Sequence, residues 1–142
     1  MNAKDISKVK FVGSLGSSPA SVNRVNGVML VNKNWFNSLP KEQRYFILLH
    51  EKGHVVCNTS NEFKADDWAF KEYASQGYSL KDAILALVNN LKFIDRKRGK
   101  YSALGKEQKN RVLMQIIRCK IYDYKILGNE NYKDWYNKNF TN

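Results

Sequence analysis

The chain has 142 residues, 43 % of them hydrophobic, which is enough for one domain with its own core (residues 1–142). No stretch approaches the roughly 20 consecutive apolar residues of a membrane-spanning helix. The first residues, MNAKDISKVKFVGS, lack the apolar segment of a secretory signal, so the sequence predicts a cytoplasmic protein.

The charge balance is strongly basic. Lys and Arg number 24 against 13 Asp and Glu, a net charge of +11, which is compatible with an acidic protein partner, a nucleic acid or a well-solvated surface. The one local cluster, Arg96-Lys97-Arg98, follows an apolar helical pattern. Cations that complete a helix C-terminus therefore explain it better than a nucleic-acid motif does.

The N-terminal part reads as β-structure. KVKFV (8–12) and GVMLV (27–31) are short, rich in β-branched residues and bounded by turn residues. Asn26-Gly27 is a strong hairpin signal, because both residues tolerate positive φ. The segment GSLGSSPAS (13–21) predicts a surface loop between the strands. We therefore expect a short antiparallel sheet.

From Pro40 onward the pattern is helical. Pro40 suits the first turn of a helix that runs to about Cys57, and the polar residues 58–60 then break it. A second helix is predicted over 60–76. It ends at Gly77, a residue suited to the left-handed conformation that follows a helix C-terminus.

Two longer helices and a short one follow. Ser79 is spaced as an N-cap for a third helix with a single apolar face, formed by Ala83, Ile84, Leu87, Val88 and Leu91. A fourth helix is predicted over 105–127, stopped by Gly128, with an apolar register of Val112, Ile116, Ile117 and Ile121. The tail, NYKDWYNKNF, suggests a last short helix. The predicted fold class is α+β, a small sheet followed by a mostly helical body.

The most informative segment is ILLHEKGHVV, residues 47–56, because it places polar groups in an apolar helix. His50 and His54 are four residues apart, so they lie one turn apart on one helix face and can reach one metal ion. Glu51 lies about a quarter turn away, where a general base would stand. The sequence contains only these two histidines. A pair of buried structural imidazoles is the weaker explanation.

A catalytic zinc usually has three protein ligands, so a third is expected nearby. Glu62 and Asp66 are four apart on the next predicted helix, and we assign Glu62 as the third ligand and Asp66 as the acceptor that orients a ligating histidine. Three alternatives stay open. Thr59-x-x-Glu62 also reads as a capping box, Asp67 competes with Asp66, and Cys57 is a conceivable soft ligand.

HEKGH followed by E-x-x-x-D, with alanine before the aspartate, resembles the gluzincin branch of the zincin metallopeptidases. It is especially similar to the compact minigluzincins and to small peptidase-like proteins of phages and mobile elements. The resemblance covers roughly residues 27–88 and not the C-terminal extension, 100–142. It implies a zincin-like body in which an active-site helix and a glutamate helix hold zinc, and a phage-encoded protein of this kind could be virion-associated.

Carried over by the resemblance, the zinc ligands are His50, His54 and Glu62, Glu51 is the base and Asp66 supports a histidine. It also implies a peptide or protein substrate lying along an edge strand, for which GVMLVNKNW (27–35) is the expected segment. No motif marks an oxyanion-stabilising group, and Tyr73 is only a candidate by location.

The predicted function is therefore a zinc-dependent metallopeptidase, a hydrolase with Zn²⁺ as cofactor and more consistent with an endopeptidase than an exopeptidase. Two other classes are open. One is a non-catalytic protein, a virion component or adaptor, that zinc merely stiffens. The other is a basic module associated with nucleic acid through its +11 charge.

Overall fold

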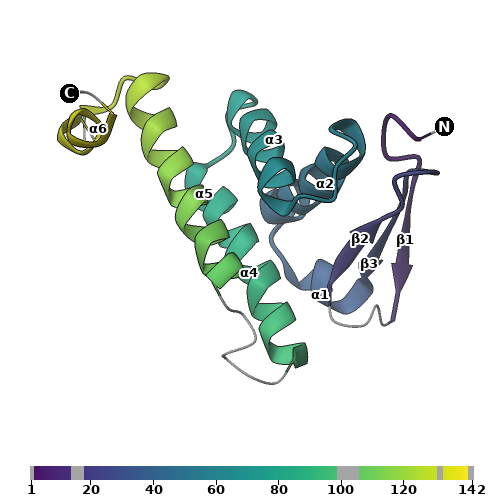
Figure 1. Ribbon diagram of the computed structural model, residues 1–142. Helices are drawn as coiled ribbons and strands as arrows, with labels where there is room; N and C mark the ends of the chain where they lie inside the picture. The colour runs from purple at the N-terminus through teal and green to yellow at the C-terminus, as the bar shows by residue number, and fades with distance from the viewer. Residues whose placement is uncertain (1, 14–17, 99–105, 131–132, 141–142) are drawn as a thin grey trace.

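The computed structural model describes residues 2–13, 18–98, 106–130 and 133–140. A small sheet lies beside a larger helical body, so the predicted α+β class is confirmed (Figure 1). The elements in chain order are β1 (Lys8–Val12), β2 (Ala20–Val22), β3 (Val28–Asn32), α1 (Lys33–Ser38), α2 (Lys41–Val56), α3 (Glu62–Ser75), α4 (Leu80–Arg98), α5 (Lys106–Lys125) and α6 (Lys133–Phe140).

The sheet is mixed, so the prediction of an antiparallel sheet is wrong for one of its two strand pairs. Its strand order is β1-β3-β2, with β1 parallel and β2 antiparallel to the central strand β3. The turn at Asn26-Gly27 does form, and Gly27 has φ +76°, but it joins β3 to β2 rather than to β1. Strand β2 lies in the segment predicted as a loop, because three residues ending a Gly- and Ser-rich stretch carry almost no strand signal.

Strand β3 covers only residues 28–32 of the segment 27–35 that was expected to form a sheet edge, and it lies in the centre of the sheet. Asn32 ends it, and the Asn32 side chain accepts a hydrogen bond from Trp35 N at 2.9 Å, which starts helix α1. Residues 27–35 therefore do not offer a sheet edge. Within the described residues the edges belong to β1 and β2.

Helix α1 was not predicted, because residues up to 35 were expected to be extended, but the other helices agree with the predicted pattern within a few residues at each end. Ser79 caps α4, since its Oγ accepts from Asp82 N at 3.4 Å. Gly77 and Gly128 have φ +86° and +73°, as expected of residues that follow a helix. Helices α2, α3 and α4 pack together, and α5 lies across α3 and α4 (Figure 1).

The residues predicted to form the buried face of α5 are wrong: they lie about one position along the chain from the residues that the structure buries. The apolar residues of the predicted register are only half-buried, whereas Arg111, Gln115 and Cys119 are buried. These polar groups are tolerated inside because each has a protein partner; Gln115 Nε2, for example, donates to Ala83 O at 2.9 Å.

The structure bears on three bulk features of the sequence. No helix in the described part of the chain has the length and apolar character needed to cross a membrane. The side chains of the basic cluster 96–98 are not among those that the structure describes. Both cysteines are thiols, with Cys57 exposed and Cys119 buried.

Candidate metal centre

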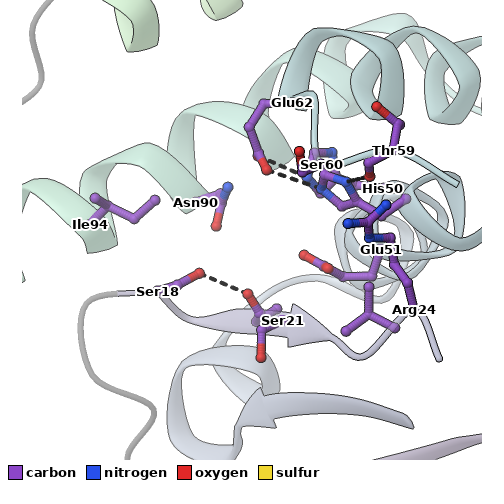
Figure 2. Close-up of a pocket in the computed structure, with 13 residues that line it drawn as sticks. Ser18, Ser21, Arg24, His50, Glu51, Thr59, Ser60, Glu62, Asn90 and Ile94 are labelled. Carbon is purple, nitrogen blue, oxygen red and sulfur yellow. Dashed lines mark hydrogen bonds and ion pairs between the residues drawn. The ribbon is translucent and has the colours of Figure 1, made fainter. Parts of the chain in front are cut away.

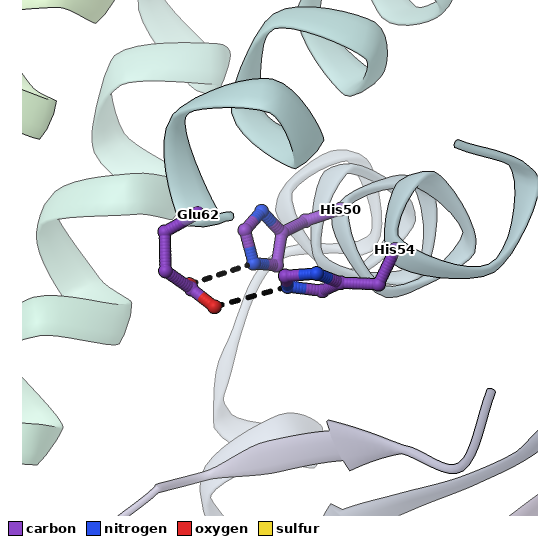
Figure 3. Close-up of side chains that lie close together, drawn as sticks. All are labelled: His50, His54 and Glu62. Atoms are coloured by element: carbon purple, nitrogen blue, oxygen red, sulfur yellow. Dashed lines mark ion pairs between the residues drawn. The ribbon is translucent and has the colours of Figure 1, made fainter. Parts of the chain in front are cut away.

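The two histidines and the first residue of α3 converge on one point. His50 Nε2 lies 3.2 Å from Glu62 Oε2, and His54 Nε2 lies 3.0 Å from Glu62 Oε1 (Figure 3). Both imidazoles are nearly buried on one face of α2. Among the described residues, His50, His54 and Glu62 form the one group whose donor atoms could hold a metal ion together.

The short turn between the two helices positions Glu62. Helix α2 ends at Val56 with Cys57 as its C-cap; Asn58 follows with φ +47°, and Thr59 N then donates to His54 O at 3.0 Å. Asn61 caps α3, its side chain accepting from Lys64 N at 3.1 Å. Glu62 is thus the first helical residue. The capping-box alternative is wrong, because Asn61 is the cap and Glu62 faces the histidines instead of Thr59 N.

Gly53, in the middle of the HEKGH motif, lets the two helices approach closely. A Cβ atom at this position would lie 3.0 Å from Ala65 O, 3.2 Å from Ala65 Cα and 3.3 Å from the Trp68 ring. A helical glycine normally costs stability relative to alanine. Here its missing side chain is what brings the first turn of α3 within reach of the histidines on α2.

The second nitrogen of each histidine is also occupied. His50 Nδ1 lies 2.8 Å from Asp66 Oδ1, although without the alignment of a full hydrogen bond, and His54 Nδ1 lies 2.8 Å from Thr59 O. An acceptor at Nδ1 favours the tautomer whose proton is on Nδ1. With Nε2 deprotonated, each histidine would direct a lone pair toward the side of Glu62, as in histidines that ligate metals, whereas in the metal-free protein His50 Nε2 shares its proton with Glu62.

The spacing of these atoms is compatible with one shared ion, since one donor atom from each of the three residues lies within 4.8 Å of the others. With bonds of about 2.0–2.1 Å, neighbouring ligand atoms of a tetrahedral zinc lie about 3.3 Å apart. The two Nε2-to-carboxylate distances, 3.2 and 3.0 Å, are close to this value. Two imidazoles and one carboxylate are also a ligand set that leaves a fourth position open, as catalytic zinc sites require.

An arginine from the C-terminal extension completes the cluster. Arg111, on α5, is 3 % exposed; its Nε and Nη2 donate to the two oxygens of Asp66 at 2.8 and 2.9 Å, and its Nη1 lies 3.1 Å from Glu62 Oε2. The sequence analysis did not identify this residue. Its only signal is that Arg111, Gln115 and Cys119 follow one another at intervals of four, a polar stripe that reads as a solvated face.

The ionisable groups of the cluster shift one another strongly. Burial by itself would lower the pKa of His50, but the charge of Asp66 and the carboxylate of Glu62 raise it to about 10. Burial would raise the pKa of Glu62, and the two histidines and Arg111 hold it well below its usual range. The pKa of Glu51 is raised, mainly by burial. Such perturbed groups gathered in one cleft are typical of functional sites.

The cluster opens into a cleft of about 280 Å³ (Figure 2). Strand β2 forms one wall, α2 forms the floor with His50, Glu51 and His54, and Asn90 and Ile94 of α4 stand on the far side. Glu51 is 6 % exposed, and no protein ion pair or hydrogen bond of its carboxylate is found in the described part of the chain. Its side chain therefore borders the same space as the three metal-ligand candidates.

Three other candidates do not reach the cluster. The Tyr73 hydroxyl is buried and donates to Glu42 O at 2.9 Å, two turns before His50, so the oxyanion role considered for Tyr73 is wrong. Cys57 is exposed and lies outside the ligand group. Asp67 pairs with Lys71 at 2.9 Å and with Arg118, not with a histidine.

Comparisons of the chain with protein-family models, with curated proteins and with solved structures gave no match. The case for a function therefore rests on the geometry of the metal centre and its cleft.

Proposed function

We propose that this chain is a zinc-dependent metallopeptidase whose ligands are His50, His54 and Glu62. The observation that carries the proposal is the convergence of both Nε2 atoms on the Glu62 carboxylate, at 3.2 and 3.0 Å, while both Nδ1 atoms face protein acceptors. A structural histidine pair would need neither the third donor nor the open cleft beside it.

Glu51 is the proposed general base. A zinc ion bound by these ligands supplies Lewis acidity, which makes water a stronger acid and polarises a carbonyl oxygen. Glu51 lies in the cleft next to both histidines, and burial raises the pKa of its carboxyl group. A carboxylate of raised basicity takes a proton from water more readily, and the same group then returns the proton to the leaving amine.

The proposed substrate is an extended polypeptide segment, and β2 replaces β3 as the strand beside which it lies. Pro19 O accepts from Asn32 N at 2.8 Å, and Asn23 N donates to Val28 O at 2.9 Å. Because hydrogen-bonding pairs alternate along an antiparallel ladder, the N–H and C=O groups of Val22 point away from β3. Ala20, Ser21 and Val22 line the cleft, so a peptide pairing with this edge would pass the metal ligands.

The test is metal content and cleavage of peptide mixtures by protein purified without added zinc, for wild type, Glu51→Gln and Glu62→Ala. We expect wild type and Glu51→Gln to hold about one zinc each and Glu62→Ala to lose most of it. Only wild type should cleave, since Glu51→Gln keeps the shape of the side chain and removes the base.

Other outcomes would point to the other classes of protein. Zinc binding without cleavage, and unchanged behaviour of Glu51→Gln, would favour a non-catalytic zinc-stiffened protein. No metal in any variant would contradict the centre itself. DNA or RNA binding that falls steeply with added salt would then make the +11 charge the next lead.

A further inference from the structure

One polar side chain in the cleft has no role in the proposed metal chemistry. Asn90, on α4, is 9 % exposed and lines the cleft opposite α2, with Ile94 one turn further along the same helix. Figure 2 shows both side chains facing the space between Glu62 and the Ser18–Ser21 segment. No hydrogen bond of the Asn90 carboxamide is found in the described part of the chain.

The polar atoms of the Asn90 carboxamide still meet the water of the cleft, since they are not among the described side-chain atoms that are both fully buried and unpaired. The carboxamide carries two donors and an acceptor, and each group that loses this water without gaining a hydrogen bond costs free energy. The neighbouring Asn89 illustrates the usual solution, because its Nδ2 donates to Gln43 Oε1 at 2.8 Å. Asn90 lacks such a partner and borders an open cleft, so its natural partner is a molecule bound there.

We propose that Asn90 binds the backbone of the polypeptide substrate by pairing with one of its peptide groups. A carboxamide presents a donor and an acceptor side by side, and a peptide group presents the complementary pair. Strand β2 offers backbone groups from the opposite wall, so the substrate is held by its main chain from both sides. Ile94 adds an apolar contact for a substrate side chain.

This arrangement defines the substrate class, and it rests on the proposed function. Recognition through the main chain requires an extended segment and reads little of its sequence. A folded protein hides its backbone groups in its own helices and sheets. The substrate of this cleft is therefore an unfolded or exposed strand-like polypeptide, with one apolar side chain near Ile94 and no demand for a charged terminus.

The experiment measures binding in a background that does not cleave. Zinc-loaded Glu51→Gln protein is titrated into fluorescein-labelled casein, an unfolded polypeptide, and anisotropy gives the Kd. Asn90→Ala and Asn89→Ala are then added separately to this background. We expect Asn90→Ala to weaken binding about tenfold or more, as the loss of two hydrogen bonds predicts, and Asn89→Ala to change it less than about twofold.

Thermal unfolding distinguishes a binding role from a structural one. Asn90→Ala breaks no protein hydrogen bond, so its Tm should equal or exceed that of the parent. Asn89→Ala breaks the bond to Gln43, so its Tm should fall. The inference is overturned if the parent does not bind casein, if Asn90→Ala binds as tightly as the parent, or if Asn90→Ala lowers the Tm as Asn89→Ala does.

Cleavage is scored separately in the wild-type background. Cleaving protein with no Asn90 effect on binding would leave the metallopeptidase standing and remove this inference. If binding depends on Asn90 but the protein cleaves nothing, the binding role of Asn90 stands and the metallopeptidase proposal falls.

Discussion

Arg111 makes the metal centre dependent on a helix far along the chain. Its guanidinium bridges Asp66 and Glu62, two carboxylates that also face His50 (Figure 3 shows Glu62 and His50). A buried ion pair need not add net stability, but removing one partner leaves a buried charge without compensation. Arg111 therefore has two roles, because it neutralises Asp66 and holds the proposed ligand Glu62 in place.

Replacing Arg111 by Met should destabilise the metal-free protein toward the lower end of about 3–5 kcal/mol, since the fully buried Asp66 loses both guanidinium bonds but keeps His50 at 2.8 Å. The matched control is Arg118→Met on the same helix. Arg118 pairs with the neighbouring Asp67, whose side chain is 43 % exposed. Lys71 remains as a second partner of Asp67, but Arg118 also donates to Gln115 Oε1 at 2.8 Å and to Phe63 O at 3.3 Å, so the loss should be about 2 kcal/mol and smaller than that for Arg111. Urea unfolding in the presence of a chelator measures both, and equal losses would contradict this account of Arg111.

Local spacing predicted that the two histidines and Glu62 lie together. His50 and His54 come from α2 and Glu62 is the first residue of α3, the next helix, so their arrangement depends on interactions within a few residues of a short turn. Arg111 acts across 45 residues, and no local pattern announces such a contact. Strand β2 is also hard to predict from local sequence, although its partner is much closer in the chain. Its three residues form a strand only because β3 pairs with them.

The close contact of α2 with α3 can be tested at Gly53. Alanine is worth about 1 kcal/mol more than glycine in a helix, but here its Cβ would press on the backbone of Ala65, which cannot rotate away. Overpacking of this kind costs about 1–3 kcal/mol. Gly53→Ala should therefore lower stability by about 1 kcal/mol and weaken zinc binding, because Glu62 moves with α3.

The control is Lys52→Ala at the adjacent position. It removes one partly exposed ion pair with Asp5, 3.3 Å, so the change in stability should stay below about 1 kcal/mol with zinc affinity unaltered. Urea unfolding measures the stability of each variant, and competition with a chromogenic chelator measures its zinc affinity. A Gly53→Ala protein that is more stable than wild type would show that α2 and α3 leave enough space for a Cβ atom at position 53.

The packing of α5 on α4 can be followed through the two thiols. Burial raises the pKa of Cys119 to about 12, and its Sγ lies 3.5 Å from Leu80 O on α4, whereas Cys57 is exposed. Because the thiolate is the reactive form, a raised pKa means that Cys119 carries almost no thiolate at pH 8. In Ellman's assay the native protein should show one fast thiol and one slow thiol. Cys57→Ser should abolish the fast phase, and two fast phases would mean that α5 does not stay on α4.

At the scale of the whole molecule, the segment that suggested a zinc peptidase from the sequence spans residues 27–88, yet residues outside that range line the cleft and contact the proposed ligands. Strand β2 supplies one wall of the cleft, Asn90 and Ile94 stand on the other, and Arg111 reaches the ligands from α5. The C-terminal extension is therefore part of the centre and not an appendage, at least as far as α5. Helix α6 contacts α5 through Tyr136 and Tyr124 and does not approach the cleft.

Two truncations separate these roles. A chain ending at residue 128 loses α6 and should fold, with zinc content equal to that of the full-length protein. A chain ending at residue 99 keeps both histidines, Glu51, Glu62 and the whole of α4, but it loses Arg111 and exposes the faces of α3 and α4 that α5 covers. Removing α5 takes away the guanidinium partner of Asp66 and the packing of α5 on α3, such as the ring contact between Tyr122 and Phe70, and this loss is large against a typical domain's stability. We expect this shorter chain to lose its cooperative thermal transition and its zinc, as circular dichroism and elemental analysis would measure. A folded, zinc-binding chain of 99 residues would show instead that the first four helices hold the metal centre unaided.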